Sequence, residues 1–384
     1  MKRIFLPFVF VLAAFTGLAQ KEKQVTENKI KPRLNNAIPA DIHLANTPVK
    51  NQSMTGTCWC FGTTSLIESQ CLKNNVGELD LSEMFTVRNT YIEKAKNYIL
   101  RQGHTQFGEG GLGHDMIHAM EVYGALPESA YSGLVNGNKM HNHQKMFGLL
   151  KEYLDSTLKT IPIPANWLEG YVKILDDNMG TPPATFTYEG REISPQMYAQ
   201  RILKFNAADY VNITSFTHQP YYKPFILQVP DNFSNGSFYN LPLNDMITLT
   251  KSALQKGNTV LWDADVSNTC FHQEWGYALL FKDGRNYTKE EFNPESLEKP
   301  YDEKTRQDLF ENLTTQDDHL MHIVGYEKTN AGKEFFLVKN SWGNIGPFKG
   351  YIKVSVAYFA MNTISLVLPK AAFSNDQLSQ LEIR

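Results

Sequence analysis

The sequence predicts an α+β protein with two lobes, because helical patterns come first along the chain and strand patterns dominate its last third. Apolar side chains recur at roughly helical spacing between Trp59 and Cys71, which indicates a buried helix over residues 58–72. Further helices are expected over 81–100 and 112–123, and strands over 259–266, 319–326, 335–338 and 351–356. A cleft between the two lobes is the expected place for a site.

Capping residues support the two later helices. Asp80 and Ser82 are candidate caps for the helix over 81–100. The helix over 112–123 should stop at Gly124, with Pro127 beyond it. Residues 135–250 alternate helical stretches with loops rich in Pro, Asn and Tyr, and they carry no motif of assignable chemistry.

Composition narrows the function classes. The chain has 384 residues, of which 42% are hydrophobic, so it can bury a large core. Its 37 basic and 40 acidic residues give a formal net charge of -3, which supplies no field for attracting nucleic acid or an anionic membrane. We therefore expect no nucleic-acid partner.

Residues 1–19 have the pattern of a signal peptide, with basic Lys2 and Arg3 followed by an apolar run of 12 residues and then small residues. The run is shorter than the ~20 residues that span a bilayer as a helix. We expect an exported protein, periplasmic or extracellular, with no membrane span after cleavage; a retained N-terminal anchor is the alternative. Residues 20–40 form a polar arm before the first domain.

The four cysteines give no clear disulfide. If residues 58–71 form one helix, its ends lie about 20 Å apart, which is far beyond disulfide reach. A bridge would have to use Cys270, and nothing in the sequence argues for one. The spacing also differs from that of structural zinc sites.

Cys58 has the sequence context of a nucleophile. It opens the predicted helix after a turn containing Gly56, and a thiol at a helix N-terminus beside an imidazolium has its pKa lowered. Cys60 faces a different side of the helix. Gln52 lies six residues before Cys58 and could aim an amide N–H at an oxyanion formed there.

A second segment, residues 317–343, offers a general base. His319 and His322 both lie on a predicted strand, and their odd separation places them on opposite faces. A base also needs an acceptor on its other ring nitrogen to set the tautomer. From the residues alone, either histidine could serve.

These segments resemble the papain superfamily of cysteine peptidases. The run TPVKNQSMTGTCWCF, residues 47–61, resembles its active-site segment, although Thr55 replaces a usual cysteine. The resemblance assigns Cys58 as the nucleophile and Gln52 to the oxyanion hole. It selects His319, six residues before Gly325, as the general base, with His322 as the alternative.

Two further parts of the resemblance complete the predicted site. In Asn-Ser-Trp-Gly, Asn340 matches the asparagine that orients the histidine ring, and Trp342 matches the indole that shields that bond. Residues 108–131 resemble the family's paired glycines, so Gly110 and Gly111 would present backbone to an extended peptide. We group Gly110, Gly111 and Trp342 as substrate-binding residues; a flexible turn is the plain alternative for the glycines.

The predicted fold is therefore papain-like, with a helical lobe and a β-barrel-like lobe over residues 41–384. The reaction is hydrolysis of a peptide bond through an acyl-enzyme, with no cofactor and no metal. His319 lies 261 residues after Cys58, against ~130 to 150 in compact members. This large, mainly helical insertion at about 135–250 resembles the bleomycin hydrolase and aminopeptidase C branch.

That branch implies further properties. Its members commonly form hexamers, and a C-terminal arm in the cleft limits them to trimming peptides from the N-terminus. This chain departs there, because 15 residues follow Pro369 and form an arm over about 370–384. We expect aminopeptidase action, with an exported endopeptidase as the alternative.

Two readings from other classes stay open. His114 and His118 stand at i and i+4, a spacing that suits a metal, but Asp115 replaces the usual glutamate and no third ligand follows. A papain-like binding module without activity is the other reading. It is disfavoured because Gln52, Cys58, His319 and Asn340 are all present.

Overall fold

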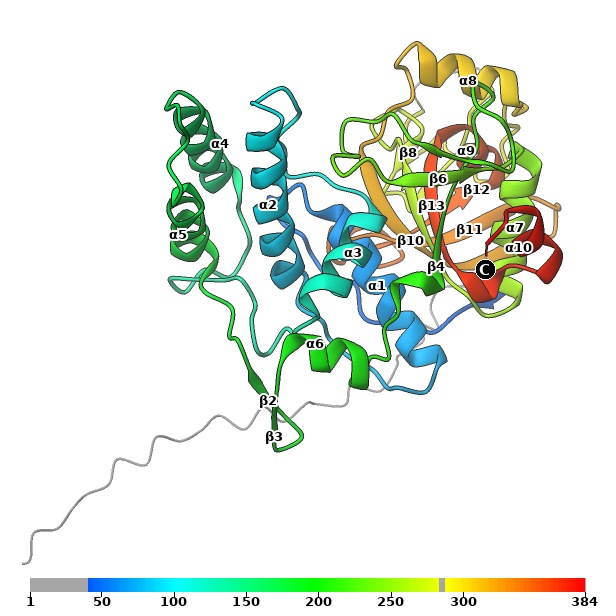
Figure 1. Ribbon diagram of the computed structural model, residues 1–384. Coiled ribbons are helices and arrows are strands. Elements are labelled where there is room, and N and C mark those ends of the chain that lie inside the picture. The colour runs from blue at the N-terminus through cyan, green and yellow to red at the C-terminus, as the bar shows by residue number, and fades with distance from the viewer. Residues whose placement is uncertain (1–40, 283–286, 384) are drawn as a thin grey trace, which may run out of the picture.

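The computed structural model describes residues 41–282 and 287–383 of the chain (Figure 1). The predicted signal peptide and the arm over 20–40 lie outside the described residues. The helices are α1 (Cys58–Lys73), α2 (Glu83–Leu100), α3 (Gly113–Tyr123), α4 (Gln144–Leu158), α5 (Trp167–Met179), α6 (Pro195–Met197), α7 (Leu243–Gln255), α8 (Glu303–Glu311), α9 (Val356–Asn362) and α10 (Asn375–Gln380). A π-helix, η1 (Tyr198–Ile202), and two 3-10 helices, η2 (Ala207–Asp209) and η3 (Lys370–Ala372), complete the helical elements.

Most strands form one mixed sheet of 11 strands. They are β1 (Ile42–His43), β4 (Tyr210–Thr214), β5 (Pro224–Ile226), β6 (Ser237–Asn240), β7 (Val260–Ala264), β8 (Phe271–His272), β9 (Tyr277–Ala278), β10 (His319–Lys328), β11 (Glu334–Lys339), β12 (Tyr351–Ser355) and β13 (Thr363–Pro369). The order is β5-β6-β4-β13-β7-β10-β11-β12-β9-β8, with β1 paired to β10. A separate hairpin joins β2 (Phe186–Tyr188) and β3 (Arg191–Ile193).

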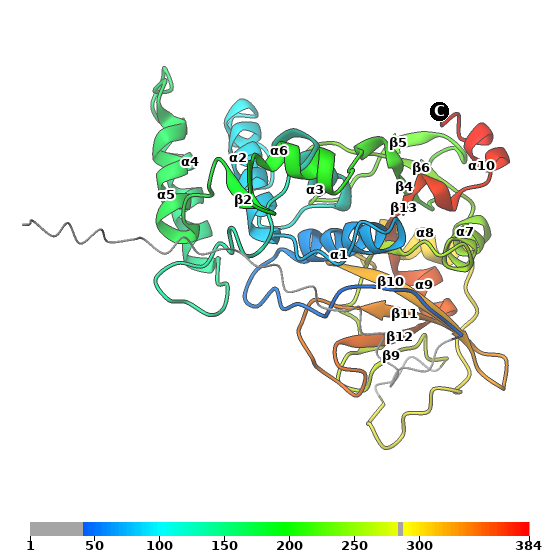
Figure 2. The same cartoon turned by 90° about the horizontal axis from the view of Figure 1, so that it is seen from below.

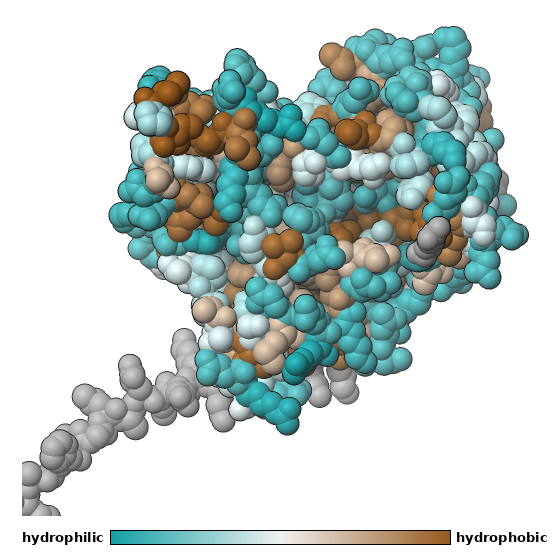
Figure 3. Space-filling view, in the orientation of Figure 1, coloured by the Kyte–Doolittle hydropathy of each residue, from teal (hydrophilic) through white to brown (hydrophobic). Residues whose placement is uncertain are grey.

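The molecule has two lobes that meet along α1. Helices α2, α4 and α5 form one side and the sheet forms the other, while α1 and α3 lie between them (Figures 1 and 2). The space-filling view is hollowed at the top, between the part built on α2 and α4 and the part built on the sheet (Figure 3). Two large apolar clusters fill the lobes, one mainly among the helices and one between the sheet, α7 and α9.

Helix α1 is buried along nearly its whole length, because it packs against helices on one side and against β7 and β10 on the other. Gly62 makes the second contact possible. A Cβ there would lie 2.9 Å from Leu261 Cδ1 and 3.3 Å from the Leu320 carbonyl oxygen, so a larger residue would push α1 away from β10. This close packing holds the start of the helix beside the start of the strand.

The segment over 135–250 carries α4 and α5 as expected of a mainly helical insertion, and it also supplies β4, β5 and β6 to the sheet. The loop between β5 and β6, residues 227–236, reaches back to α2 and α3. Asn97 Nδ2 donates to the Phe233 carbonyl at 3.4 Å, and Ser234 Oγ donates to Asp115 at 2.6 Å.

The C-terminal arm packs against the sheet lobe. Phe373 and Leu381 are buried in the cluster formed with α7, and Lys256 Nζ donates to the Ala372 carbonyl at 2.9 Å. Phe373, Asn375 and Leu378 line one cavity together with the C-terminal part of α1. Since α1 has 16 residues and is about 24 Å long, the arm lies at the opposite end of this helix from Cys58.

All four cysteines are free. Within the described ranges, no helix is both long enough and apolar enough to cross a membrane.

Candidate active site

Cys58 is the first residue of α1 and is 7% exposed. The first amides of a helix have no partner within it, so the N–H groups at this end can face a bound oxyanion. The Cys58 sulfur interacts with the main chain of Leu320, the residue after His319. The thiol therefore lies at the start of β10. Cys60 faces elsewhere, since its sulfur donates to the Glu83 carbonyl at 3.3 Å.

His319 is held by Asn340. Its Nε2 lies 2.7 Å from Asn340 Oδ1, and the same oxygen accepts the Ser341 amide at 2.7 Å. The Ser341 amide donates to this atom, and the Asn side chain accepts only through its oxygen, so His319 Nε2 must carry the proton of the bond to Asn340. Nδ1 is consequently the basic nitrogen of the ring.

A second bond fixes the asparagine itself. Asn340 Nδ2 donates to Gln273 Oε1 at 2.9 Å, and Gln273 Nε2 reaches the Tyr351 carbonyl at 3.3 Å. The indole of Trp342 covers the imidazole, with ring centroids 4.6 Å apart. His319 and Asn340 are both buried, so their bond is shielded from water.

Gln52 joins the two lobes beside the nucleophile. Its Nε2 donates to the Thr55 carbonyl at 2.7 Å, and its Oε1 accepts Ser341 Oγ at 2.6 Å. The second hydrogen on Nε2 remains for another acceptor. Its position three residues before the turn at Thr55 suits the predicted oxyanion role, although one N–H is already engaged.

The two glycines of the predicted substrate surface have different neighbours. Gly111 lies flat against Trp59, because a Cβ there would be 3.1 Å from the indole. A Cβ on Gly110 would instead be 1.8 Å from Asp231 Oδ2, so the carboxylate of Asp231 sits directly on this glycine. A residue of the insertion, Asp231, therefore contacts the predicted substrate-binding glycines.

Burial controls the protonation of the pair. We expected a lowered pKa for Cys58, but burial raises this pKa to about 12. The hydrogen bond to the Leu320 backbone opposes the rise, and the carboxyls of Asp317, Asp231 and Asp263 add to it. Burial also lowers the pKa of His319 to about 4, with the bond to Asn340 acting in the opposite direction. Burial therefore favours the protonated thiol and the neutral imidazole in the free site.

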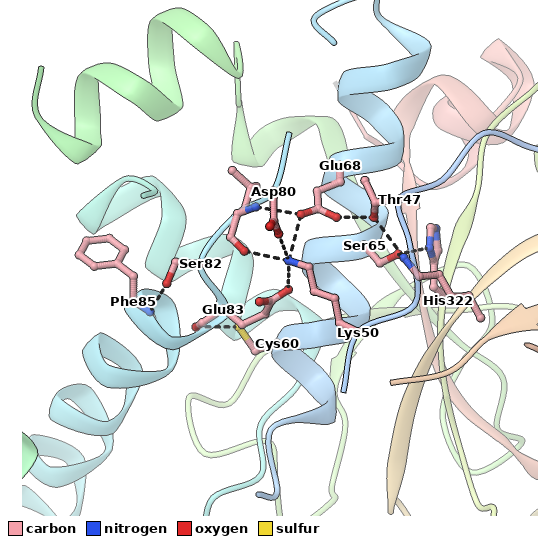
Figure 4. A network of polar contacts seen from close by, with 12 residues as sticks. Thr47, Lys50, Cys60, Ser65, Glu68, Asp80, Ser82, Glu83, Phe85 and His322 are labelled. Carbon is pink, nitrogen blue, oxygen red and sulfur yellow. Dashed lines mark hydrogen bonds and ion pairs between the residues drawn. The ribbon is translucent and has the colours of Figure 1, made fainter. Parts of the chain in front are cut away.

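His322 lies in a buried polar network with Ser65 of α1 (Figure 4). Its Nδ1 bonds Ser65 Oγ at 2.8 Å, and Ser65 also accepts Lys339 Nζ at 2.7 Å. Burial and the neighbouring Lys339 hold the pKa of His322 well below its usual value. The structure thus separates the two competing histidines and brings only His319 to Asn340.

Lys50 forms the centre of the rest of this network. Its Nζ lies 2.8 Å from Glu83, 2.7 Å from Asp80 and 3.4 Å from Glu68, and it also donates to the Leu81 carbonyl at 3.0 Å (Figure 4). Burial disfavours its charge, but the acidic neighbours outweigh that effect and raise the pKa of Lys50. The network ties the segment before Cys58 to α1 and α2.

The histidines with metal-like spacing do not converge on a site. His114 Nε2 bonds Ser234 Oγ at 2.9 Å, while His118 Nε2 faces Glu93 at 3.5 Å. Among residues 41–282 and 287–383, no group of three or more His, Cys, Asp or Glu side chains could hold a metal ion.

Several residues near the site were not among those predicted from the sequence. Glu109 accepts the Gly56 amide at 2.7 Å through its side chain and the Trp59 indole at 3.0 Å through its carbonyl, so it ties the glycine segment to the nucleophile turn. Gln273 lies outside every motif. Glu109 and Ser341 could have been found, because they belong to the glycine segment over 108–131 and to the Asn-Ser-Trp-Gly run.

A comparison with protein families matches nearly the whole chain. The model of the peptidase C1-like family covers residues 16–384. The chain belongs to this family. The match confirms the predicted resemblance and the predicted enzyme class, a cysteine-type peptidase.

Alignments with known relatives cover most of this chain. Aminopeptidase C of Streptococcus thermophilus is 22% identical, over 89% of this chain and 84% of its own length. Bleomycin hydrolase of Gallus gallus is 21% identical, over 94% and 87%. The crystal structure of PepW from Lactobacillus rhamnosis aligns with a TM-score of 0.73 at 19% identity, over 90% and 84% of the two chains. This likeness confirms the predicted papain-like fold.

Proposed function

We propose that the protein hydrolyses peptide bonds through Cys58, His319 and Asn340, and that it acts as an aminopeptidase. The observation that carries the proposal is the buried bond from His319 Nε2 to Asn340, with the Cys58 sulfur at the neighbouring Leu320. This bond leaves Nδ1 as a base, which is what a cysteine nucleophile needs.

The neutral resting pair suggests how the reaction begins. The Cys58 sulfur attacks the peptide carbonyl while His319 Nδ1 takes its proton, so the thiolate need not exist before substrate binds. The Cys58 amide and Gln52 stabilise the oxyanion. His319 then protonates the leaving amine and afterwards activates the water that releases the acyl group.

The names of the relatives support an aminopeptidase, since aminopeptidases C, G and W all match most of this chain. One observation favours the endopeptidase alternative. The C-terminal arm packs at the far end of α1 and leaves the cleft beside Cys58 to other groups. Residues 370–383 therefore do not form an arm that blocks this cleft.

Two variants test the chemistry. Cys58→Ala should abolish hydrolysis of peptides, whereas Cys270→Ala, which changes a cysteine outside the site, should leave it unchanged. Full turnover by Cys58→Ala would refute the mechanism. Blocked and free peptides of one sequence, offered side by side, test the mode of cleavage, and efficient internal cleavage of the blocked peptide would favour the endopeptidase.

Export is proposed on the pattern of residues 1–19 alone. Amino-terminal sequencing of the protein purified from its native cells tests it, since an exported chain should begin near Gln20. The homo-oligomer implied by the branch also stays a prediction, which the mass of the purified protein in solution can check.

A further inference from the structure

The loop over 227–236 places the acidic side chain of Asp231 against Gly110, one of the predicted substrate-binding glycines. Asp231 lies on Gly110, and its Oδ1 also accepts Gln106 Nε2 at 3.2 Å. The loop is fixed from inside by Asn232, whose Nδ2 donates to the Leu227 and Gly236 carbonyls at 2.8 and 2.9 Å. Asp231 is thus held in place by its own loop and by the helical lobe.

Two further carboxyls approach Cys58. Asp317 stands two residues before His319, and Asp263 pairs with Leu320 across β7 and β10. Both act on the Cys58 thiol electrostatically, as Asp231 does. Asp263 is 1% exposed and accepts Ser365 Oγ through Oδ2 at 2.9 Å, and the carboxyls of Asp263 and Asp317 also contact each other. Burial holds the pKa of Asp263 well above its usual value and raises that of Asp317 to about 7.

The positive charge nearby is already engaged. Lys94 Nζ donates to the Gly108 carbonyl at 2.9 Å and to the Gly110 carbonyl, and it lies 4.9 Å from the centre of the Phe233 ring. Burial raises the pKa of Asp231. The charge of Lys94 lowers this pKa, and the charge of Asp115 adds to the rise. Lys94 is therefore not free to neutralise Asp231 and the Asp263–Asp317 pair fully, and a cationic ligand bound here would favour the ionised forms of these carboxyls.

The geometry favours an organic ammonium over a metal ion. No set of three ligating side chains in the described ranges is close enough to hold a metal. Gly111 packs on Trp59, next to the nucleophile, and Gly110 is one residue farther along. The Asp231 carboxylate therefore lies one residue beyond the glycine that packs beside the nucleophile, a placement that suits a substrate with a single residue before the scissile bond.

We infer that Asp231, backed by Asp263 and Asp317, binds the α-ammonium group of the peptide substrate and so limits cleavage to the first residue. The inference rests on the proposed function and deepens it. The carboxylate fills the space over Gly110 that the backbone of a second residue would need. It also supplies a charge-assisted hydrogen bond to the amine that ends the chain.

Substrate charge would then assist the nucleophile. The three carboxyls add to the burial that raises the pKa of Cys58. An ammonium bound among them cancels part of their field, which favours loss of the thiol proton at the moment the substrate is in place. An N-acetylated peptide brings no such charge.

The test compares free and N-acetylated forms of one short peptide amide on wild type, Asp231→Asn and Ser234→Ala. Ser234→Ala removes a bond that fastens the same loop and leaves the carboxylate in place. In wild type the free peptide should be preferred at least 100-fold in kcat/KM. Asp231→Asn should reduce that preference about 10- to 100-fold, while Ser234→Ala should retain it.

A second measurement serves if Asp231→Asn folds poorly. In wild type, replacing the α-amino group of the substrate by a hydroxyl removes the charge but keeps a polar group of similar size, and it should lower kcat/KM about 10-fold or more. Where the variant folds, Cys58 should also be alkylated several-fold faster at fixed pH than in wild type, as peptide mapping can show, because a negative charge has gone.

The outcomes separate this inference from the proposed function. If wild type requires a free amine but Asp231→Asn keeps the full preference, the aminopeptidase stands and the role of Asp231 is overturned. If wild type cuts free and acetylated peptides equally well, both are overturned. If Ser234→Ala loses the preference as far as Asp231→Asn does, the packing of the loop sets it and the carboxylate does not.

Discussion

His319 Nε2 lies 2.7 Å from Asn340 Oδ1, and Asn340 is held from its other side by Gln273 at 2.9 Å. The bond joins the first residue of β10 to the residue after β11, two strands that pair in the sheet. The sheet therefore fixes the distance between the imidazole and its partner, and the side-chain bonds fix the ring orientation.

Asn340→Ala should lower kcat/KM about 10- to 100-fold, the range seen when a group that orients a functional histidine is removed. Burial lowers the pKa of His319 and the bond to Asn340 opposes it, so the variant should also lose activity at a lower pH than wild type. Profiles of kcat/KM against pH for both proteins check this. Gln273→Ala, one step farther from the ring, should show a smaller loss.

The acid limb of activity should have its midpoint near pH 4. Burial lowers the pKa of His319 to about 4 from its usual 6.5, so the ring stays neutral and basic until the pH falls through that value. A peptide amide with a free α-amino group suits the measurement, because that group titrates at about pH 8, well above the acid limb. A midpoint near 6.5 would contradict the buried geometry of the ring.

His319→Ala and His322→Ala should fail in different ways. The first should abolish turnover with little change in stability. The second should keep a large part of the activity but lose about 1–3 kcal/mol of stability, because Ser65 Oγ loses its buried histidine partner. Denaturant unfolding and kcat, measured on both variants, distinguish them. Loss of turnover by His322→Ala at full stability would reverse the assignment.

Lys50→Met should be strongly destabilising, by about 3–5 kcal/mol, because Glu68 and Glu83 would remain buried without their cation. The matched control is Lys173→Met, whose partner Asp177 lies 3.0 Å away on the exposed face of α5. That change should cost no more than about 0.5 kcal/mol. Equal losses in the free energy of unfolding would show that the network contributes little.

Gly110→Ala should act on Asp231 without changing its charge. The added Cβ would lie 1.8 Å from Asp231 Oδ2, so the loop must shift, at a cost of about 1–3 kcal/mol. The preference for free-amine peptides should fall with it. Gly148→Ala, in α4 with no atom within 4 Å of the added Cβ, should instead gain about 0.5–1 kcal/mol. Thermal unfolding and the substrate ratio together check the pair.

Local pattern was enough to find many of the elements. Ser82 caps α2 through the Phe85 amide, and Gly124 ends α3 with a positive φ, as their residue types predict. The run over 356–369 was missed. It is buried throughout and mostly apolar, so periodicity could not divide it into α9 and β13.

The sequence by itself determined the fold class and the candidate residues Gln52, Cys58, His319 and Asn340, because these lie in short motifs whose spacing is local. Only the tertiary structure decided which groups surround them. Asp231 comes from a loop about 170 residues after Cys58, and Asp263 reaches the thiol through a strand pairing. Such contacts depend on long-range packing, and the same packing buries Cys58 and raises its pKa.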